Sequence, residues 1–125
     1  MLRIAVCDDM PEGLQSLVLL INQYLSDNNL DAEVTEFSHS DGLLKAIGAE
    51  SFHLYILDIV MPMVNGLELG KEIRRLDREA QIIYATTEPQ FALQAYMASP
   101  LNYLIKPIEK TQLFDTLTLA ISKAD

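Results

Sequence analysis

Short apolar runs alternate with segments of helical periodicity along this chain. The runs at 2–7, 54–57, 81–85 and 103–105 are rich in branched and aromatic residues, which is typical of buried strands. Between them, apolar residues recur every three or four positions, as on the buried face of an amphipathic helix. These groups are Leu14, Leu17, Val18, Ile21 and Leu25; Leu43, Leu44 and Ile47; Leu67, Leu69, Ile73 and Leu76; and Leu113, Leu117 and Ile121.

The segment at 32–37, AEVTEF, has a different pattern. It alternates polar with apolar residues, which predicts a half-buried strand at the edge of a sheet. Alternating strands and helices predict an α/β fold with a parallel sheet and helices on both faces. With the segment at 91–98 as a further helix, five strands and five helices fit a flavodoxin-like, doubly wound sheet of strand order 2-1-3-4-5. In 91–98 we expect Ala92, Leu93 and Ala95 to pack on the sheet.

Length and composition limit the class of protein. At 125 residues, half of them apolar, the chain fits one domain over residues 1–125. It contains no apolar run long enough to span a bilayer, and its single cysteine, Cys7, cannot form a disulfide within the chain, so we expect a cytoplasmic protein with no membrane contact. A net charge of −9 argues against nucleic-acid binding through this domain.

Polar residues follow four of the predicted strands. Asp8 and Asp9 follow the first, Asp58 the third, Thr86 ends the fourth, and Lys106 follows the fifth. Each alone could be a solvated turn residue or a helix cap. Together they lie at the carboxyl ends of parallel strands, where ligands bind in doubly wound folds.

Three carboxylates at one edge repel each other unless a cation joins them. A hard cation such as Mg²⁺, or Mn²⁺ in its place, prefers oxygen ligands and bridges protein carboxylates to phosphoryl groups. Lys106 supplies a second positive charge, and Thr86 a hydrogen-bond donor. Asp58 is the candidate nucleophile, because a carboxylate can accept a phosphoryl group as a mixed anhydride when the phosphoryl oxygens are neutralised. The residues thus predict a metal-assisted phosphoacceptor.

Four motifs in chain order carry a family resemblance. AVCDDM, YILDIVMPMVNGLEL, IIYATTEPQFALQAY and YLIKPI resemble the motif blocks of the receiver domain of two-component response regulators, over residues 2–122. The third block together with LNYLIKPI is most similar to receivers attached to LytTR-type DNA-binding domains. The resemblance implies a phosphorylation-dependent signalling domain, not an enzyme beyond its own phosphorylation and dephosphorylation.

The resemblance also implies a role for each site residue. Asp58 matches the phosphoacceptor, Asp9 the direct Mg²⁺ ligand and Asp8 its acidic companion. The backbone carbonyl of Val60 completes the protein ligands of the metal. Val60 stands where some relatives carry a polar residue that orients water, so we expect a longer-lived phosphoryl group than in fast-cycling chemotaxis receivers.

Further matches concern the residues that change conformation when the acceptor is phosphorylated. Thr86 matches the switch hydroxyl, Tyr103 the switch aromatic, and Lys106 the lysine that contacts the phosphoryl group. The bond before Pro107 is expected to be cis. Gly66 fits a turn after the acceptor loop, where a positive φ is often needed.

The partners implied are a sensor histidine kinase and, after phosphorylation, a second copy of the chain. The segment at 91–98 is apolar on nearly every side, which indicates a second buried face. We therefore expect a partner surface at Phe91, Tyr96 and Met97. Control of transcription would act through a C-terminal DNA-binding domain absent from this sequence.

Three other functions fit these residues less well. A haloacid-dehalogenase-type phosphatase also uses an Asp nucleophile and Mg²⁺, but it would need a second Asp where Val60 stands. A flavin carrier would need a hydroxyl- and glycine-rich phosphate loop in place of CDDMPEG. A phosphorylation-independent interaction module remains the main alternative, and the complete set of acids with Thr86 and Lys106 argues against it.

Overall fold

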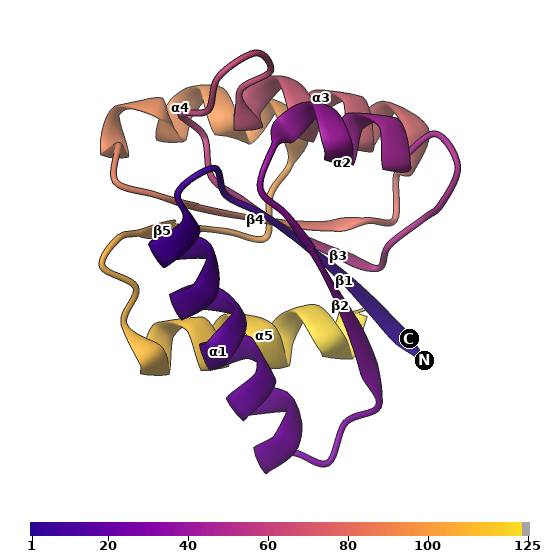
Figure 1. Ribbon diagram of the computed structural model, residues 1–125, viewed down its shortest axis with the longest axis vertical. Helices are drawn as coiled ribbons and strands as arrows, with labels where there is room; N and C mark the ends of the chain where they lie inside the picture. Colours follow the sequence, from indigo (N-terminus) through magenta and orange to yellow (C-terminus); the bar gives the residue numbers. More distant parts are fainter. Residues whose placement is uncertain (124–125) are drawn as a thin grey trace.

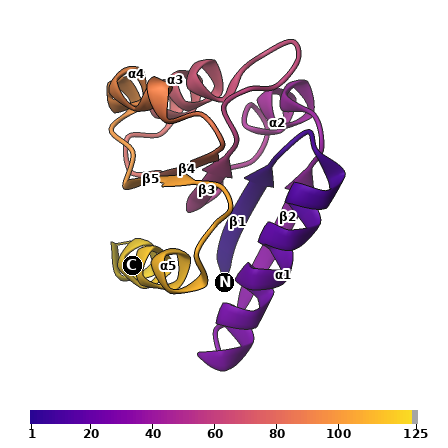
Figure 2. The same cartoon turned by 90° about the vertical axis from the view of Figure 1, so that its left-hand side faces the viewer.

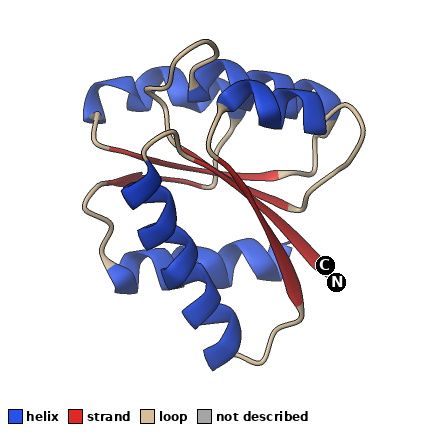
Figure 3. Ribbon diagram, in the orientation of Figure 1, coloured by secondary structure: helices blue, strands red, loops and turns tan. Residues whose placement is uncertain are grey.

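A five-stranded parallel sheet lies between two layers of helices (Figures 1 and 3). The computed structural model describes residues 1–123. Helices α1 and α5 cover one face of the sheet, and α2, α3 and α4 cover the other (Figure 2). The elements are β1 (Leu2–Cys7), α1 (Pro11–Asp27), β2 (Ala32–Phe37), α2 (Ser40–Ala46), β3 (Leu54–Leu57), α3 (Gly66–Leu76), β4 (Gln81–Thr86), η1 (Pro89–Phe91), α4 (Ala92–Ala95), η2 (Tyr96–Ala98), β5 (Asn102–Ile105) and α5 (Lys110–Lys123).

The strand order is β2-β1-β3-β4-β5, as the sequence predicts for a flavodoxin-like sheet. β2 lies at an edge, and its residues are half-buried or exposed, whereas the last four residues of β1 and all of β3 are buried. Cys7 pairs with Leu57, and Leu57 pairs with Tyr84. This register brings the carboxyl ends of β1, β3 and β4 to one edge of the sheet.

Two apolar cores lie on the two faces of the sheet. The first joins β1, β3 and β4 to α1 and α5, and the second joins the same strands to α2, α3 and α4. Because side chains alternate along a strand, Ile4 and Val6 enter the first core while Ala5 and Cys7 enter the second. Within residues 1–123, no helix combines the length and apolar character needed to cross a membrane.

The segment at 91–98 differs from the single helix that the sequence predicts. It consists of a four-residue α-helix between two turns of 3₁₀-helix. Ala95 is buried, but Leu93 is 81% exposed, so the prediction that Leu93 packs on the sheet is wrong. Because one side of so short a helix faces the core, its remaining apolar side chains point to solvent.

Tyr84 and Gly70 form a tight contact between the sheet and α3. Tyr84 is fully buried on β4, and a Cβ atom at Gly70 would lie 1.9 Å from the Tyr84 hydroxyl oxygen. That hydroxyl has no hydrogen-bond partner among the described residues, and burial raises the pKa of Tyr84 to about 12. A glycine at position 70 is therefore required by the length of the facing tyrosine.

We predict that Gly70→Ala lowers the free energy of unfolding by about 1–3 kcal/mol through overpacking. Tyr84→Phe should be neutral or stabilising, because it removes an unpaired buried hydroxyl. In the Tyr84→Phe background, Gly70→Ala should cost less than it does alone. Urea unfolding of the four proteins measures this coupling, and additive effects would contradict the prediction.

Candidate functional site

Three carboxylates meet at the carboxyl edge of the sheet. Oxygen atoms of Asp8, Asp9 and Asp58 all lie within 4.8 Å of one another. Asp8 is 1% exposed and Asp58 is 8% exposed, so two of these groups are held largely away from water. The structure thus brings together the three acids that the sequence singles out.

Backbone hydrogen bonds fix two of the acids. The Asp58 amide donates to the Cys7 carbonyl at 3.0 Å, which ties the end of β3 to the end of β1. The Asp58 Oδ1 atom accepts from the Ile59 amide at 2.7 Å, and the Asp8 Oδ1 atom accepts from the Met10 amide at 2.9 Å. One oxygen of each carboxylate is therefore held by the backbone, and the Oδ2 atoms face Lys106.

The Lys106 ammonium bridges Asp8 and Asp58. Its Nζ atom lies 2.5 Å from Asp8 Oδ2 and 3.3 Å from Asp58 Oδ2. The Lys106 amide donates to the Thr86 carbonyl at 2.8 Å, and the bond between Lys106 and Pro107 is cis, as expected from the sequence. A Cβ atom at Gly13 would lie 2.8 Å from Asp8 Oδ2, so a glycine there leaves room for the pair.

The charges at this edge perturb each other. Burial raises the pKa of Asp58, the Lys106 ammonium acts against that rise, and the Asp8 carboxylate adds to it. For Lys106, burial lowers the pKa, but the nearby Asp8 and Asp58 carboxylates outweigh burial and hold the pKa above its usual range. One lysine thus neutralises only part of the negative charge of the three acids.

A buried oxygen atom of Asp9 indicates that a further cation can bind at this site. Its Oδ1 atom is buried and has no hydrogen-bond partner within residues 1–123. A buried carboxylate oxygen without a partner is costly, and Mg²⁺ is bound in proteins through oxygen atoms of this kind. The acid set therefore fits a divalent cation.

Thr86 and Tyr103 are linked through the backbone of Glu88. Thr86 is fully buried, and its Oγ1 atom accepts from the Glu88 amide at 3.3 Å. The Tyr103 hydroxyl donates to the Glu88 carbonyl, and its ring lies 6.1 Å from the Tyr84 ring. The Thr86 side chain also acts against the rise in the pKa of Asp58 that burial causes.

The loop between β3 and α3 corrects one expectation. Gly66 does not have a positive φ; the residue that does is Met63, at 72°. Gly66 is needed for space, because a Cβ atom there would lie 1.9 Å from the Asp58 carbonyl oxygen. The Gly66 amide also donates to the Ile59 carbonyl at 2.8 Å. Val60 lies inside this loop and is 54% exposed.

Two residues that contact the site or its loop escape sequence reasoning. Gly13 provides space beside Asp8, and the only signal in the sequence is a glycine in the first turn of a helix. Ser40 is 2% exposed and bonds to the β3–α3 loop, although its position suggests an ordinary helix cap. Neither contact follows from local sequence, because each joins segments far apart in the chain.

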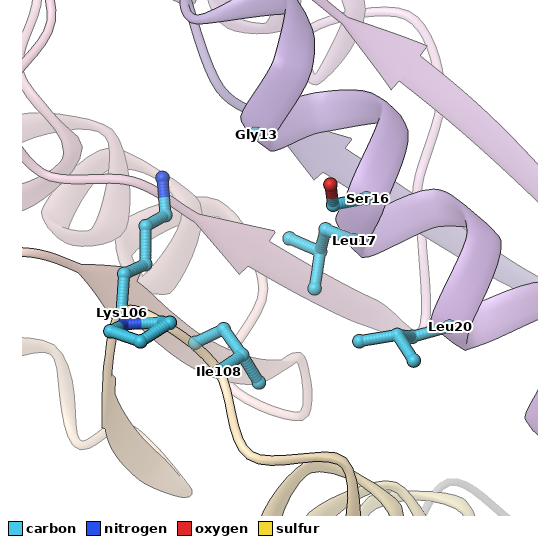
Figure 4. A pocket seen from close by; sticks show the side chains of 7 residues that line it. Gly13, Ser16, Leu17, Leu20, Lys106 and Ile108 are labelled. Carbon is cyan, nitrogen blue, oxygen red and sulfur yellow. The ribbon is translucent and has the colours of Figure 1, made fainter.

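A cavity of about 290 Å³ lies next to the acid site, between α1 and the loop after β5 (Figure 4). Figure 4 shows the Lys106 side chain rising at one end of this cavity. The other residues that line it are mostly apolar: Gly13, Ser16, Leu17, Leu20, Pro107 and Ile108.

The predicted partner surface is largely open to solvent. Tyr96 and Met97 are each 73% exposed, whereas Phe91 is half-buried against the second core. The two exposed side chains are the better candidates for contact with another molecule.

We predict that Asp58→Asn stabilises the metal-free protein by about 0.5–2 kcal/mol. The change removes one of three crowded carboxylates, while Lys106 keeps its closer partner Asp8. Thermal unfolding in EDTA measures the effect, and Asp115→Asn, at an exposed position in α5, is the matched control. Lower stability of Asp58→Asn in EDTA would contradict the prediction.

Comparison with known proteins places the chain in a family. Residues 4–118 match the family model described as the response regulator receiver domain. The chain is 27% identical to the sensory transduction protein LytR of Staphylococcus epidermidis, over 99% of the chain and 46% of that protein. It is 26% identical to the sensory transduction protein LytT of Bacillus subtilis, over 94% of the chain and 47% of that protein. The chain thus spans less than half the length of these curated relatives.

Solved structures agree with this placement. The response regulator TrrA of Thermotoga maritima, solved in complex with Mg²⁺-BeF, is 27% identical and superposes with a TM-score of 0.78 over 96% of this chain and 99% of that one. The response regulatory domain of mrkE from Klebsiella pneumoniae superposes with a TM-score of 0.88 over 98% of both chains, at 20% identity, and supports the fold alone. The match over residues 4–118 establishes that this chain belongs to the receiver domain family of two-component response regulators, and its LytR and LytT relatives agree with the LytTR-type resemblance seen in the sequence.

Proposed function

We propose that this protein is a signal receiver that accepts a phosphoryl group on Asp58 from a sensor histidine kinase. The observation that carries the proposal is the contact of one ammonium group, on Lys106, with two of three clustered carboxylates. Such an arrangement holds a carboxylate at the surface end of a strand with positive charge already beside it. We propose that the receiver comprises residues 1–125, of which the last two lie outside the described residues.

The positions of the side chains suit direct transfer of the phosphoryl group to Asp58. A carboxylate oxygen of Asp58 attacks the phosphorus of a phosphohistidine; a P–O bond forms, the P–N bond breaks, and the imidazole leaves with its electron pair. Lys106 shifts from the carboxylates to an oxygen of the phosphoryl group, and the Thr86 hydroxyl donates to another. Lys106 already contacts Asp58, and Thr86 ends β4, the strand beside β3, so transfer needs only local movement.

The metal site is part of the proposal. Asp8, Asp9, Asp58 and the Val60 backbone carbonyl would hold Mg²⁺, or Mn²⁺ in its place. A divalent cation held there would supply positive charge to the phosphoryl oxygens. The unpartnered Oδ1 atom of Asp9 and the surplus of negative charge support this assignment.

Phosphorylation would alter the surface around Tyr103. A phosphoryl group adds about 1.5 to 2 negative charges and strong acceptor oxygens. When Thr86 turns toward it, Thr86 gives up its bond to the Glu88 amide, and the Glu88 carbonyl that holds the Tyr103 hydroxyl can then move. The outcome is a population shift between two packings of β4, β5 and α4.

The output is proposed to be control of transcription. The LytR and LytT relatives are longer than this chain, and LytR of Staphylococcus aureus carries the name transcriptional regulatory protein. DNA binding would belong to a further domain, because a net charge of −9 disfavours contact with a phosphate backbone. We do not propose an enzyme acting on external substrates, since no acid stands two residues after Asp58.

Incubation with acetyl phosphate and Mg²⁺ should add the mass of one phosphoryl group to the protein. The gain should disappear in EDTA and in Asp58→Ala, and it should persist in Asp115→Ala, a control at an exposed aspartate. Intact-protein mass spectrometry measures it. A gain that survives in Asp58→Ala would refute the acceptor assignment, and steady hydrolysis of added phosphate esters would favour a phosphatase instead.

Phosphorylation should also promote self-association through Tyr96 and Met97. Tyr96→Asp should abolish the phosphorylation-dependent change in sedimentation, because it places a charge in an apolar contact. Leu19→Asp, at a residue of α1 that is 71% exposed, is the matched control and should associate like wild type. Unchanged sedimentation of phosphorylated Tyr96→Asp would count against this surface.

A further inference from the structure

Ser40 is the first residue of α2, but its hydroxyl serves a different segment of the chain. The Oγ atom donates to the Pro62 carbonyl at 3.1 Å and accepts from the Val64 amide at 3.3 Å. A serine at the start of a helix commonly caps the amides of that helix. Here the N-cap residue of α2 is His39, which makes no side-chain cap bond. The buried hydroxyl of Ser40 therefore joins α2 to the β3–α3 loop.

The two bonds of Ser40 enclose Met63. This residue has a φ of 72°, a left-handed conformation that long side chains rarely adopt. Its side chain is 87% exposed, so packing does not hold it there. The peptide groups on either side of Met63 are instead fixed by the Ser40 hydroxyl.

The same loop carries Val60. The two ends of the loop are joined by the Gly66 amide, which donates to the Ile59 carbonyl at 2.8 Å, and the Ile59 amide donates to Asp58 Oδ1. Ser40 holds the loop between these ends, at Pro62 and Val64. The path of residues 59–64 thus depends on these hydrogen bonds and on the buried contact of the Cys7 Sγ atom with the Met61 Sδ atom at 3.8 Å. Around Met63 itself, the distant side chain that holds the backbone is Ser40.

We propose that Ser40 is a positioning residue for divalent-cation binding. By fixing the loop around Met63, it sets the position of the Val60 carbonyl relative to Asp58, without touching the ion. The inference rests on the proposed function, because it takes the acid cluster and Val60 as the ligands of Mg²⁺. It adds a structural element, the start of α2, to the site that the acids define.

The test compares Mg²⁺ binding by unphosphorylated Ser40→Ala and wild type, measured by isothermal titration calorimetry. We expect the dissociation constant for Mg²⁺ to rise about 3- to 10-fold, less than the loss typical of groups that bond directly to a metal ligand. Ser38→Ala, an exposed serine two residues earlier, is the matched control and should bind like wild type. Amide exchange at Val64 should accelerate in Ser40→Ala, and the melting temperature in EDTA should fall by only a few degrees.

A second variant separates positioning from general loosening of the fold. Met63→Gly allows a positive φ at no steric cost, so the loop should then depend less on Ser40. In that background, Ser40→Ala should weaken Mg²⁺ binding by less than about 2-fold. Unchanged affinity in Ser40→Ala, or an equal loss in both backgrounds, would overturn the proposal and leave the proposed function intact. Wild type that neither binds Mg²⁺ nor gains a phosphoryl group would refute both.

Discussion

The concentration of negative charge at the carboxyl edge of the sheet is the constraint on which this structure depends. Asp8 and Asp58 are almost entirely buried, and an isolated buried carboxylate is costly unless it is paired and hydrogen-bonded. The fold meets this cost with backbone amides on one oxygen of each acid and with the Lys106 ammonium on the other. Even so, one lysine balances one charge of three. The remaining demand for positive charge makes the edge suited to a divalent cation and a phosphoryl group, which is the role we propose for it.

The lysine also connects charge to conformation. Lys106 follows β5 directly, and its amide is bonded to the carbonyl of Thr86 at the end of β4. Phosphorylation at Asp58 would draw both side chains toward one group, from two adjacent strands. Because Thr86 and Tyr103 share Glu88 as a hydrogen-bonding partner, a change at the acid site can reach Tyr103 on β5 through two hydrogen bonds.

Most of the fold and the core of the site could be predicted from sequence, because both follow from periodicity. β1, β2 and β3 match the predicted segments, and the acids at the strand ends meet because parallel strands share an edge. The buried side of the segment at 91–98 could not be predicted in full, because apolar residues lie all round the helix and do not indicate which side packs on the sheet. The prediction of a positive φ at Gly66 was wrong for a related reason: sequence indicates a turn, but which residue takes the positive φ depends on contacts with Asp58 and Ser40.

The contacts that were not predicted share one property. In each, a small residue makes room for a group that is far away in the chain. Gly13 makes room for the pair of Asp8 and Lys106, and Gly70 makes room for Tyr84. Such residues carry no chemistry of their own, so motif reasoning passes over them. Their effect is to fix distances: a side chain larger by one carbon at position 13 would press on the Oδ2 atom of Asp8, which is the closest partner of Lys106. The reactive groups decide which chemistry the site can perform, and these small residues decide whether the groups can approach closely enough to perform it.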